Sequence, residues 1–281
     1  MSRTILTHTP ITADRVVRGT VELPPQGTTD APILLFVPGF KGFRDWGGWP
    51  WLTRSLADGG FIVHRVDLSM NGYTGRSELH DEPEKFAQNT FSHDLEDLDV
   101  LLDSTERWGI PPGVSSDRIG IIGHSRGGVV SLLFASEHPS IEAVATLGAP
   151  ARGVSIYREE LHEQWREEGY LEIPNARTGQ VLKLDISVLE DYEENRERYD
   201  VERAIVEKPL PSLVIHGSED ETVSITEAVE LMNWLPHANS RLEALETGHT
   251  FGFSHPFGGA DEAGQAVLDL LTHWFTEELA P

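Results

Sequence analysis

The chain has 281 residues, and its 22 lysine and arginine residues against 46 aspartate and glutamate residues give a formal net charge of −24. A surface this acidic repels nucleic acid and anionic membranes, so the composition argues against both as partners. The chain contains no cysteine, which excludes disulfides, a catalytic thiol and thiolate metal sites.

The basic residues include only four lysines, and such acidic, lysine-poor surfaces resemble those of proteins from salt-rich cells. An ordinary acidic protein is the alternative. The first residues contain no apolar core of a signal peptide, and no apolar run reaches the roughly 18 residues of a membrane-spanning helix. We therefore expect a cytoplasmic protein with no membrane span.

The first part of the chain predicts strands that alternate with helices. Residues 14–23 alternate in polarity as an antiparallel strand does, whereas 33–37 and 61–67 read as strands that are covered on both faces. The helix between those two strands ends near 59–60. A second helix over 91–108 has leucines on one stripe and acids on the other.

The same alternation continues through the middle and the end of the chain. A central strand over 119–123 is followed by a helix to about 138 and a strand over 143–147. The last predicted elements are a strand at 213–216, a helix over 225–235, a strand over 241–245 and a helix over about 261–279. This order predicts an α/β fold, a mainly parallel central sheet with helices on both faces.

Residues 151–208 do not fit one crossover between neighbouring strands. They contain a short helical stripe, a hairpin around the turn Pro-Asn-Ala-Arg-Thr-Gly, and a charged helix with aromatic residues. We interpret them as a helix-hairpin-helix cap inserted into one core domain formed by 1–150 and 209–281. A disordered insert is the alternative, but the aromatic content argues against it.

The central strand leads into Gly123-His124-Ser125-Arg126-Gly127, and a helical pattern follows. This is a G-x-S-x-G motif between a strand and a helix, the context in which the serine is a nucleophile. The turn strains the serine backbone, and a Cβ on Gly123 or Gly127 would collide with the neighbouring chain. The alternative interpretation is an ordinary glycine-rich strand-helix turn.

A serine nucleophile needs a base, and the base needs an acid that orients it. Asp220 follows one later strand and His249 follows the next. Because the carboxyl ends of parallel strands meet at one edge of the sheet, we expect both side chains near Ser125. Glu219 and Glu221 flank Asp220 and are rival candidates for the acid.

Other histidines compete for the role of base: His93, His124, His138 and His255. His249 alone directly follows a strand in the expected last position. A pair of nearby histidines could suggest a metal, but no carboxylate has matching ligand spacing, so we expect no metal and no cofactor.

The motif and the order Ser125, Asp220, His249 resemble the α/β-hydrolase superfamily, over nearly the whole chain. The family pattern His-Gly-x-x-Asp-x-x-Val begins here at His216 and implies Asp220 as the acid, with Glu219 and Glu221 as solvated loop charges. Some relatives carry the acid after the sixth strand instead, but residues 148–151 contain none. The resemblance also implies a lid at the position of the predicted cap.

Acyl transfer also requires two N–H donors for the oxyanion. The residue after the nucleophile, Arg126, supplies one. The other is expected from the turn after 33–37, where relatives carry His-Gly and this chain has Pro38-Gly39. Phe40 N–H is the natural donor there, with Lys41 as the alternative.

The candidate substrate contacts are Lys41, Trp46, His124, Tyr157 and Trp165. Two of them have alternative interpretations, because Trp46 could pack beneath the sheet and His124 could be a core histidine bonded to backbone.

The expected function is hydrolysis of small to medium carboxylic esters through an acyl-enzyme, with a small-molecule ester as the partner. A peptidase or an acyltransferase would share these residues, and a non-catalytic α/β-hydrolase-fold binding protein is a further alternative. Within the superfamily, Gly-Phe-Lys-Gly and His-Gly-Ser-Glu-Asp are similar to dienelactone-hydrolase-like esterases and to prolyl-oligopeptidase-type catalytic domains.

Overall fold

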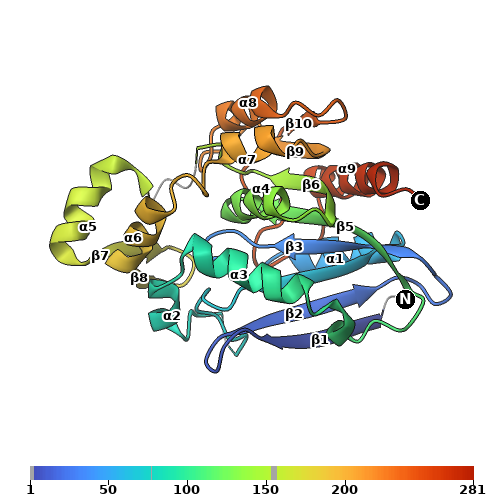
Figure 1. The fold of residues 1–281 in the computed structure, drawn as a ribbon, viewed down its shortest axis with the longest axis horizontal. Helices are drawn as coiled ribbons and strands as arrows, with labels where there is room; N and C mark the ends of the chain where they lie inside the picture. The colour runs from blue at the N-terminus through green and yellow to red at the C-terminus, as the bar shows by residue number, and fades with distance from the viewer. Residues whose placement is uncertain (1–2, 77, 153–156) are drawn as a thin grey trace.

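The computed structural model describes residues 3–76, 78–152 and 157–281, and one large sheet runs through it (Figure 1). Its strands are β1 (Arg3–Pro10), β2 (Val16–Leu23), β3 (Ala31–Val37), β4 (Ile62–Asp67), β5 (Ser115–His124), β6 (Ile141–Leu147), β9 (Ser212–Gly217) and β10 (Arg241–Leu245). They lie in the order β1-β2-β4-β3-β5-β6-β9-β10. β1 pairs antiparallel with β2 and β2 with β4, and the remaining pairs are parallel. The predicted mainly parallel sheet is confirmed.

Helices cover both faces of this sheet. On one face pack α1 (Trp49–Asp58) and α9 (Glu262–Glu278); on the other pack α3 (Phe91–Leu102), α4 (Arg126–Glu137) and α8 (Ile225–Trp234). Successive side chains of a strand point to opposite faces, so Leu34 and Phe36 join the first core while Leu35 and Val37 join the second. Burial on both faces explains why β3 is a continuous apolar run.

The predicted cap lies between β6 and β9 and projects from one end of the sheet (Figure 1). It contains η3 (Glu159–Leu161), α5 (His162–Glu168), the hairpin of β7 (Tyr170–Asn175) and β8 (Gln180–Asp185), α6 (Ile186–Glu194) and α7 (Val201–Glu207). Leu184, Val188 and Leu189 are fully buried. These side chains belong to the same apolar core as those of α3 and α4, so the described part of the predicted cap is folded against the main sheet and its helices. Residues 153–156 lie outside the described residues.

Some elements differ from the sequence-based prediction. The helix expected over 91–108 ends at Leu102 and resumes as η1 (Thr105–Trp108), where the Ser104 hydroxyl donates to Leu101 O at 3.1 Å and competes with the helical hydrogen bonds. Neither β1 nor α2 (Pro83–Ala87) was expected. Tyr199 lies outside α6, in the turn before α7.

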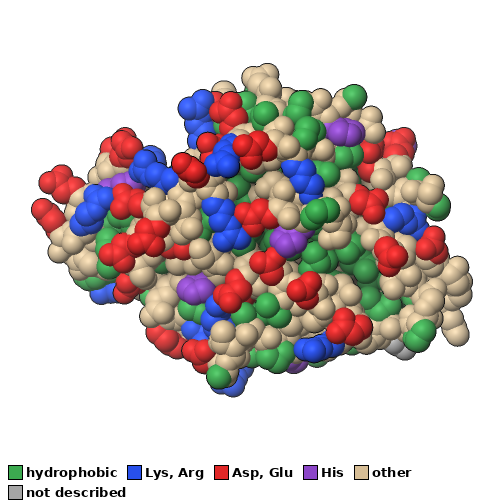
Figure 2. Space-filling model, in the orientation of Figure 1, with side chains coloured by type: hydrophobic (Ala, Val, Ile, Leu, Met, Phe, Trp, Pro, Cys, Tyr) green, Lys and Arg blue, Asp and Glu red, His purple; other side chains and the backbone are tan. Residues whose placement is uncertain are grey.

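The described helices include none with both the length and the hydropathy needed to cross a membrane. Acidic side chains are spread over most of the face in Figure 2. Several arginines are paired at the surface, as Arg198 is with Glu137 at 2.7 Å and Arg203 with Glu207 at 3.0 Å. Such pairs leave the excess of 24 negative charges uncompensated, and these charges repel one another.

We predict that salt stabilises the folded protein. Repulsion between surface charges is screened within about 10 Å at about 0.1 M salt and more strongly at higher concentrations. The melting temperature should therefore rise from low salt to about 1 M NaCl, and the rise should shrink at a pH close to the isoelectric point as the carboxylates lose charge. A melting temperature that falls over this range at neutral pH would refute adaptation to high salt.

Candidate active site

Ser125 lies at the junction of β5 and α4 with a strained backbone, φ 52° and ψ −122°. A positive φ is rare for any residue other than glycine and persists only where the surroundings impose it. Ser125 N donates to Leu147 O at 2.8 Å, and Ser125 O accepts from Gly128 N at 2.8 Å. These bonds attach the turn to β6 on one side and to the first turn of α4 on the other.

The two motif glycines allow backbone segments to approach more closely than a side chain would permit. A Cβ on Gly123 would lie 2.2 Å from Gly127 O, and a Cβ on Gly127 would lie 2.4 Å from Val37 O. Carbon atoms do not approach carbonyl oxygens this closely, so the collision that the motif predicts is confirmed.

Asp220 and His249 form a short hydrogen bond. His249 Nδ1 lies 2.7 Å from Asp220 Oδ2, and the carboxylate is fully buried whereas the imidazole is 16% exposed. Asp220 Oδ1 accepts from the N–H groups of Thr222 and Val223 at 2.8 and 2.9 Å. An Nδ1–H that donates to this carboxylate leaves Nε2 of His249 as a proton acceptor.

A second histidine supports the loop that carries Asp220. His216, at the end of β9, is fully buried and donates from Nε2 to Val223 O at 2.9 Å. The same Nε2 lies 3.4 Å from Asp220 Oδ2. This contact holds the carboxylate of Asp220 close to the end of β9.

His124, next to the serine, has a structural contact with His249. Its Nε2 lies 3.0 Å from His249 O, and its ring packs 4.9 Å from the ring of Trp49. Burial, reinforced by the charge of His249, lowers the pKa of His124 to about 3, so the ring is neutral and Nε2 is the donor. The bond to His249 O agrees with the alternative interpretation of His124 as a core histidine bonded to backbone. The side chain also borders the cavity.

The other candidate bases and acids have different partners or face the solvent. His93 Nδ1 bonds Gln88 O at 3.0 Å, His138 pairs with Asp99 at 2.7 Å, and His255 pairs with Glu78 at 3.0 Å. Both glutamates that flank Asp220 are exposed, as expected.

The predicted oxyanion donors come from two segments that meet at the serine. Gly42 N donates to Gly39 O at 2.9 Å, and Lys41 has φ 59°, so the chain after β3 forms a tight turn. A Cβ on Gly39 would lie 3.0 Å from Ser125 Cβ. Phe40 N–H belongs to this turn. Arg126 N–H is at the first residue of α4, where a helix has no carbonyl of its own to bond.

The Arg126 side chain lies in a buried polar cluster, whereas its N–H is the predicted oxyanion donor. The guanidinium pairs with Asp94 Oδ2 at 2.9 Å, donates to Asn89 Oδ1, and lies 4.7 Å from the centre of the Phe91 ring. Burial raises the pKa of Asp94, and the charge of Arg126 opposes that rise. The side chain thus anchors the start of α4 to α3.

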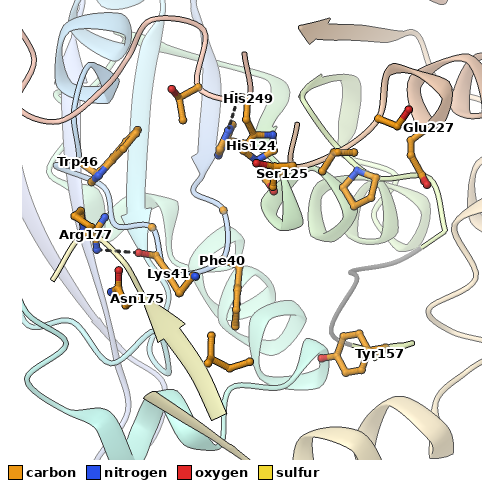
Figure 3. Close-up of a pocket in the computed structure, with 18 of the residues that line it drawn as sticks. Phe40, Lys41, Trp46, His124, Ser125, Tyr157, Asn175, Arg177, Glu227 and His249 are labelled. Carbon is orange, nitrogen blue, oxygen red and sulfur yellow. Dashed lines mark hydrogen bonds between the residues drawn. The ribbon is translucent and has the colours of Figure 1, made fainter. Parts of the chain in front are cut away.

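A cavity of about 830 Å³ opens at the serine, between the sheet edge and the predicted cap (Figure 3). Four of the predicted substrate contacts border it together with Ser125 and His249: Lys41, Trp46, His124 and Tyr157. Tyr157 is nearly buried and stacks on the cap residue Tyr192, with ring centres 4.2 Å apart.

Trp165 does not border the cavity. It is fully buried in the cap, and its Nε1 donates to Leu184 O at 3.1 Å. The prediction that Trp165 contacts the substrate is therefore wrong, because the indole is buried in the apolar core that the predicted cap shares with α3 and α4.

Several cavity residues were missed by the sequence analysis. Asn175 is the last residue of β7, Arg177 lies in the turn between β7 and β8, and Glu227 comes from α8 (Figure 3). The turn composition identifies the hairpin but does not indicate that it folds over the serine. Within the described residues, no group of three or more histidine or acidic side chains could hold a metal ion.

Solved structures share the fold of this chain. Est1E from Butyrivibrio proteoclasticus is 17% identical with a TM-score of 0.69, over 99% of this chain and 100% of that one. The same protein with ferulic acid bound is 18% identical, also with a TM-score of 0.69, over 98% and 100%. A dienelactone hydrolase from Anabaena variabilis is 19% identical with a TM-score of 0.59, over 99% of each chain.

Similarity in sequence identifies the family. A bis(hydroxyethyl) terephthalate hydrolase from Streptomyces coelicolor is 26% identical in an alignment of 225 positions that covers 68% of this chain and 66% of that protein. The chain thus matches just under two thirds of that relative's length. The model of the prolyl oligopeptidase family matches residues 50–281, a range that includes Ser125, Asp220 and His249. The chain therefore belongs to the prolyl oligopeptidase family and has the α/β-hydrolase fold.

Proposed function

We propose that this protein is a serine carboxylic ester hydrolase that works through an acyl-enzyme. The observation that carries the proposal is the 2.7 Å bond from His249 Nδ1 to the buried carboxylate of Asp220, at a cavity that Ser125 also borders. A serine hydroxyl in such a cavity becomes a nucleophile when a neutral, oriented imidazole accepts its proton.

In the proposed reaction, Ser125 Oγ attacks the ester carbonyl while His249 Nε2 accepts the hydroxyl proton. The N–H groups of Phe40 and Arg126 donate to the oxyanion that forms. The tetrahedral intermediate collapses, His249 returns the proton to the leaving alcohol, and the acyl group stays on Ser125. Water then attacks the acyl-enzyme with His249 as the base, which releases the acid and restores the serine.

The relatives support ester hydrolysis. One is a bis(hydroxyethyl) terephthalate hydrolase, and one structural neighbour holds ferulic acid. The cavity of this chain has aromatic side chains on both sides, Phe40 and Trp46 from the core and Tyr157 and Tyr192 from the cap. A cavity of about 830 Å³ with this lining suits a small or medium ester.

A peptidase is the second candidate, because the family that matches is the prolyl oligopeptidase family. The same triad would cleave an amide, and the two candidates differ in what the cavity admits. Turnover of aminoacyl anilides at a rate above that of matched esters would favour the peptidase.

The first test removes members of the triad. Ser125→Ala should lower kcat on the order of 10⁴- to 10⁶-fold, and Asp220→Asn about 10⁴-fold because the amide favours the wrong imidazole tautomer. Kinetics on 4-nitrophenyl butyrate measure both. Glu221→Gln is the matched control, since it neutralises an exposed acid next to Asp220 and should leave kcat unchanged. Near-normal turnover by Ser125→Ala or Asp220→Asn contradicts the assignment.

The second test is the pH profile. Activity should fall as the solution is acidified, because protonated His249 cannot accept the serine proton. The pKa of His124 is about 3, so its protonation does not contribute to this fall in the neutral and mildly acidic range. A profile of kcat/KM that stays flat from about pH 8 to about pH 5 would exclude a histidine base.

The third test concerns the cap, which we infer to be residues 151–208 and to cover the site. Its residues Ile173, Asn175 and Tyr157 border the cavity and limit the space for the acyl or alcohol group. We expect 4-nitrophenyl acetate or butyrate to be hydrolysed much faster than the palmitate ester, and casein to be left intact.

Replacing the cap by a short loop should relax this chain-length preference while Ser125 still reacts with a small fluorophosphonate. The phosphonate reaction is the control for an intact core. Unchanged selectivity in the loop variant, or a preference of the intact enzyme for long-chain emulsions, would mean that the cap does not cover this site.

A further inference from the structure

Two cationic side chains stand next to each other at one end of the cavity (Figure 3). Lys41 belongs to the turn after β3, and Arg177 belongs to the hairpin turn of the cap. Arg177 Nη2 donates to Lys41 O at 3.2 Å, and Lys41 Nζ donates to Pro174 O at 3.1 Å. We call Lys41 and Arg177 the cation pair. Its two members are held by backbone carbonyls, and among the described residues no carboxylate lies within ion-pair distance of either.

Burial opposes the charge of both members of the cation pair. Burial, and then the charge of Arg177, lowers the pKa of Lys41, and burial also lowers the pKa of Arg177. Burial lowers the pKa of the nearby His80 to about 4, with further contributions from both members of the pair. Tyr73 and then Glu78 raise the pKa of Arg177, and the carboxylate of Glu78 pairs with His255 at 3.0 Å.

The cation pair has hydrogen-bond donors that are not used in these two bonds. A lysine ammonium has three N–H donors and an arginine guanidinium five, and each side chain uses one of its nitrogens in the bonds above. The Arg177 guanidinium also lies 5.0 Å from the centre of the Phe43 ring, which supports it from one side. A carboxylate is a suitable acceptor for the remaining donors, because ammonium and guanidinium groups form strong charge-assisted hydrogen bonds with its oxygens.

Two other charged side chains of the cavity, Glu227 and Arg152, already have polar partners. Glu227 Oε2 accepts from Ala151 N at 2.8 Å and from Arg152 N at 3.3 Å, and the Arg152 side chain pairs with Glu230 at 2.8 Å. Among the described residues, the lining contains four basic side chains, Lys41, Arg152, Arg158 and Arg177, and one carboxylate. The whole chain has the opposite bias, 46 acids against 22 bases.

We propose that the cation pair binds a free carboxylate on the substrate, so that the preferred substrates are monoesters of dicarboxylic acids. This inference rests on the proposed function and adds the substrate class to it. A neutral ester of the same length would leave the two cations unpaired in the cavity, whereas the carboxylate of a monoester would accept hydrogen bonds from both.

The test compares two esters that differ in one charge, 4-nitrophenyl hydrogen adipate and 4-nitrophenyl methyl adipate. We expect the wild-type protein to have the lower KM for the anionic ester. Arg177→Gln should raise that KM roughly tenfold to a hundredfold, as expected for a lost charge-assisted hydrogen bond, and should leave kcat and the KM of the neutral ester little changed.

Three further variants separate binding from structure. Arg177→Lys keeps the charge and should retain part of the preference for the anionic ester. Lys41→Gln removes the other cation of the pair and should reduce the same preference. Arg107→Gln makes the same change in net charge at a side chain that is 75% exposed in η1, away from the cavity, and should leave both KM values unchanged. Equal KM values for the two esters in the wild type, or a ratio that Arg177→Gln does not alter, would overturn the proposal.

A binding measurement keeps this inference separate from the proposed function. If neither ester is hydrolysed and a fluorophosphonate does not label Ser125, the proposed function fails. Calorimetry with adipate and dimethyl adipate on the Ser125→Ala protein then decides the anion site alone. Binding of adipate that disappears in the Ser125→Ala/Arg177→Gln protein supports the site, and absence of adipate binding overturns it.

Discussion

The active site depends on one close approach, between the turn that carries Ser125 and the end of β3. A Cβ on Gly127 would lie 2.4 Å from Val37 O, so the two segments meet backbone to backbone. Holding Ser125 at φ 52° costs on the order of 1–3 kcal/mol, which the bond to Leu147 O and the buried parallel strands offset. The chain that follows Val37 carries Phe40 and Lys41, so the same contact brings the predicted oxyanion donor and one member of the cation pair to the serine.

Arg126 connects this turn to the cap. Its guanidinium pairs with Asp94 of α3 in a buried cluster, and breaking such a pair costs about 3–5 kcal/mol because a buried charge loses its partner. At the start of the same helix, the Ser92 hydroxyl bonds Asp191 of α6 and Tyr199. The nucleophile turn, α3 and the cap are therefore linked by polar contacts, and the cap is held relative to the site by more than apolar packing.

Periodicity and motif order were enough to predict the sheet around β5 and the helix after Ser125, and the resemblance to the α/β-hydrolases identified Asp220 as the partner of His249. These features are local or follow from the rule that parallel strand ends share an edge. The sequence does not show which packed surface a residue faces. Trp165 is apolar whether it lines a cavity or a core, and Arg177 contacts Lys41, which lies more than a hundred residues earlier in the chain. β1 was not predicted, because it is an edge strand and its sequence has little apolar pattern of its own.

The charge of the whole chain and the charge of the cavity act over different distances. A net charge of −24 repels a polyanion that must approach a broad surface, which is why composition argues against nucleic acid. Screening in physiological salt limits that repulsion to about 8 Å, so a small anion in the cavity is affected mainly by the charges beside it. Those charges include Lys41 and Arg177, held by backbone carbonyls and free to donate. A strongly acidic protein can therefore select an anionic substrate, provided that a few cations are fixed where the carboxylate has to lie.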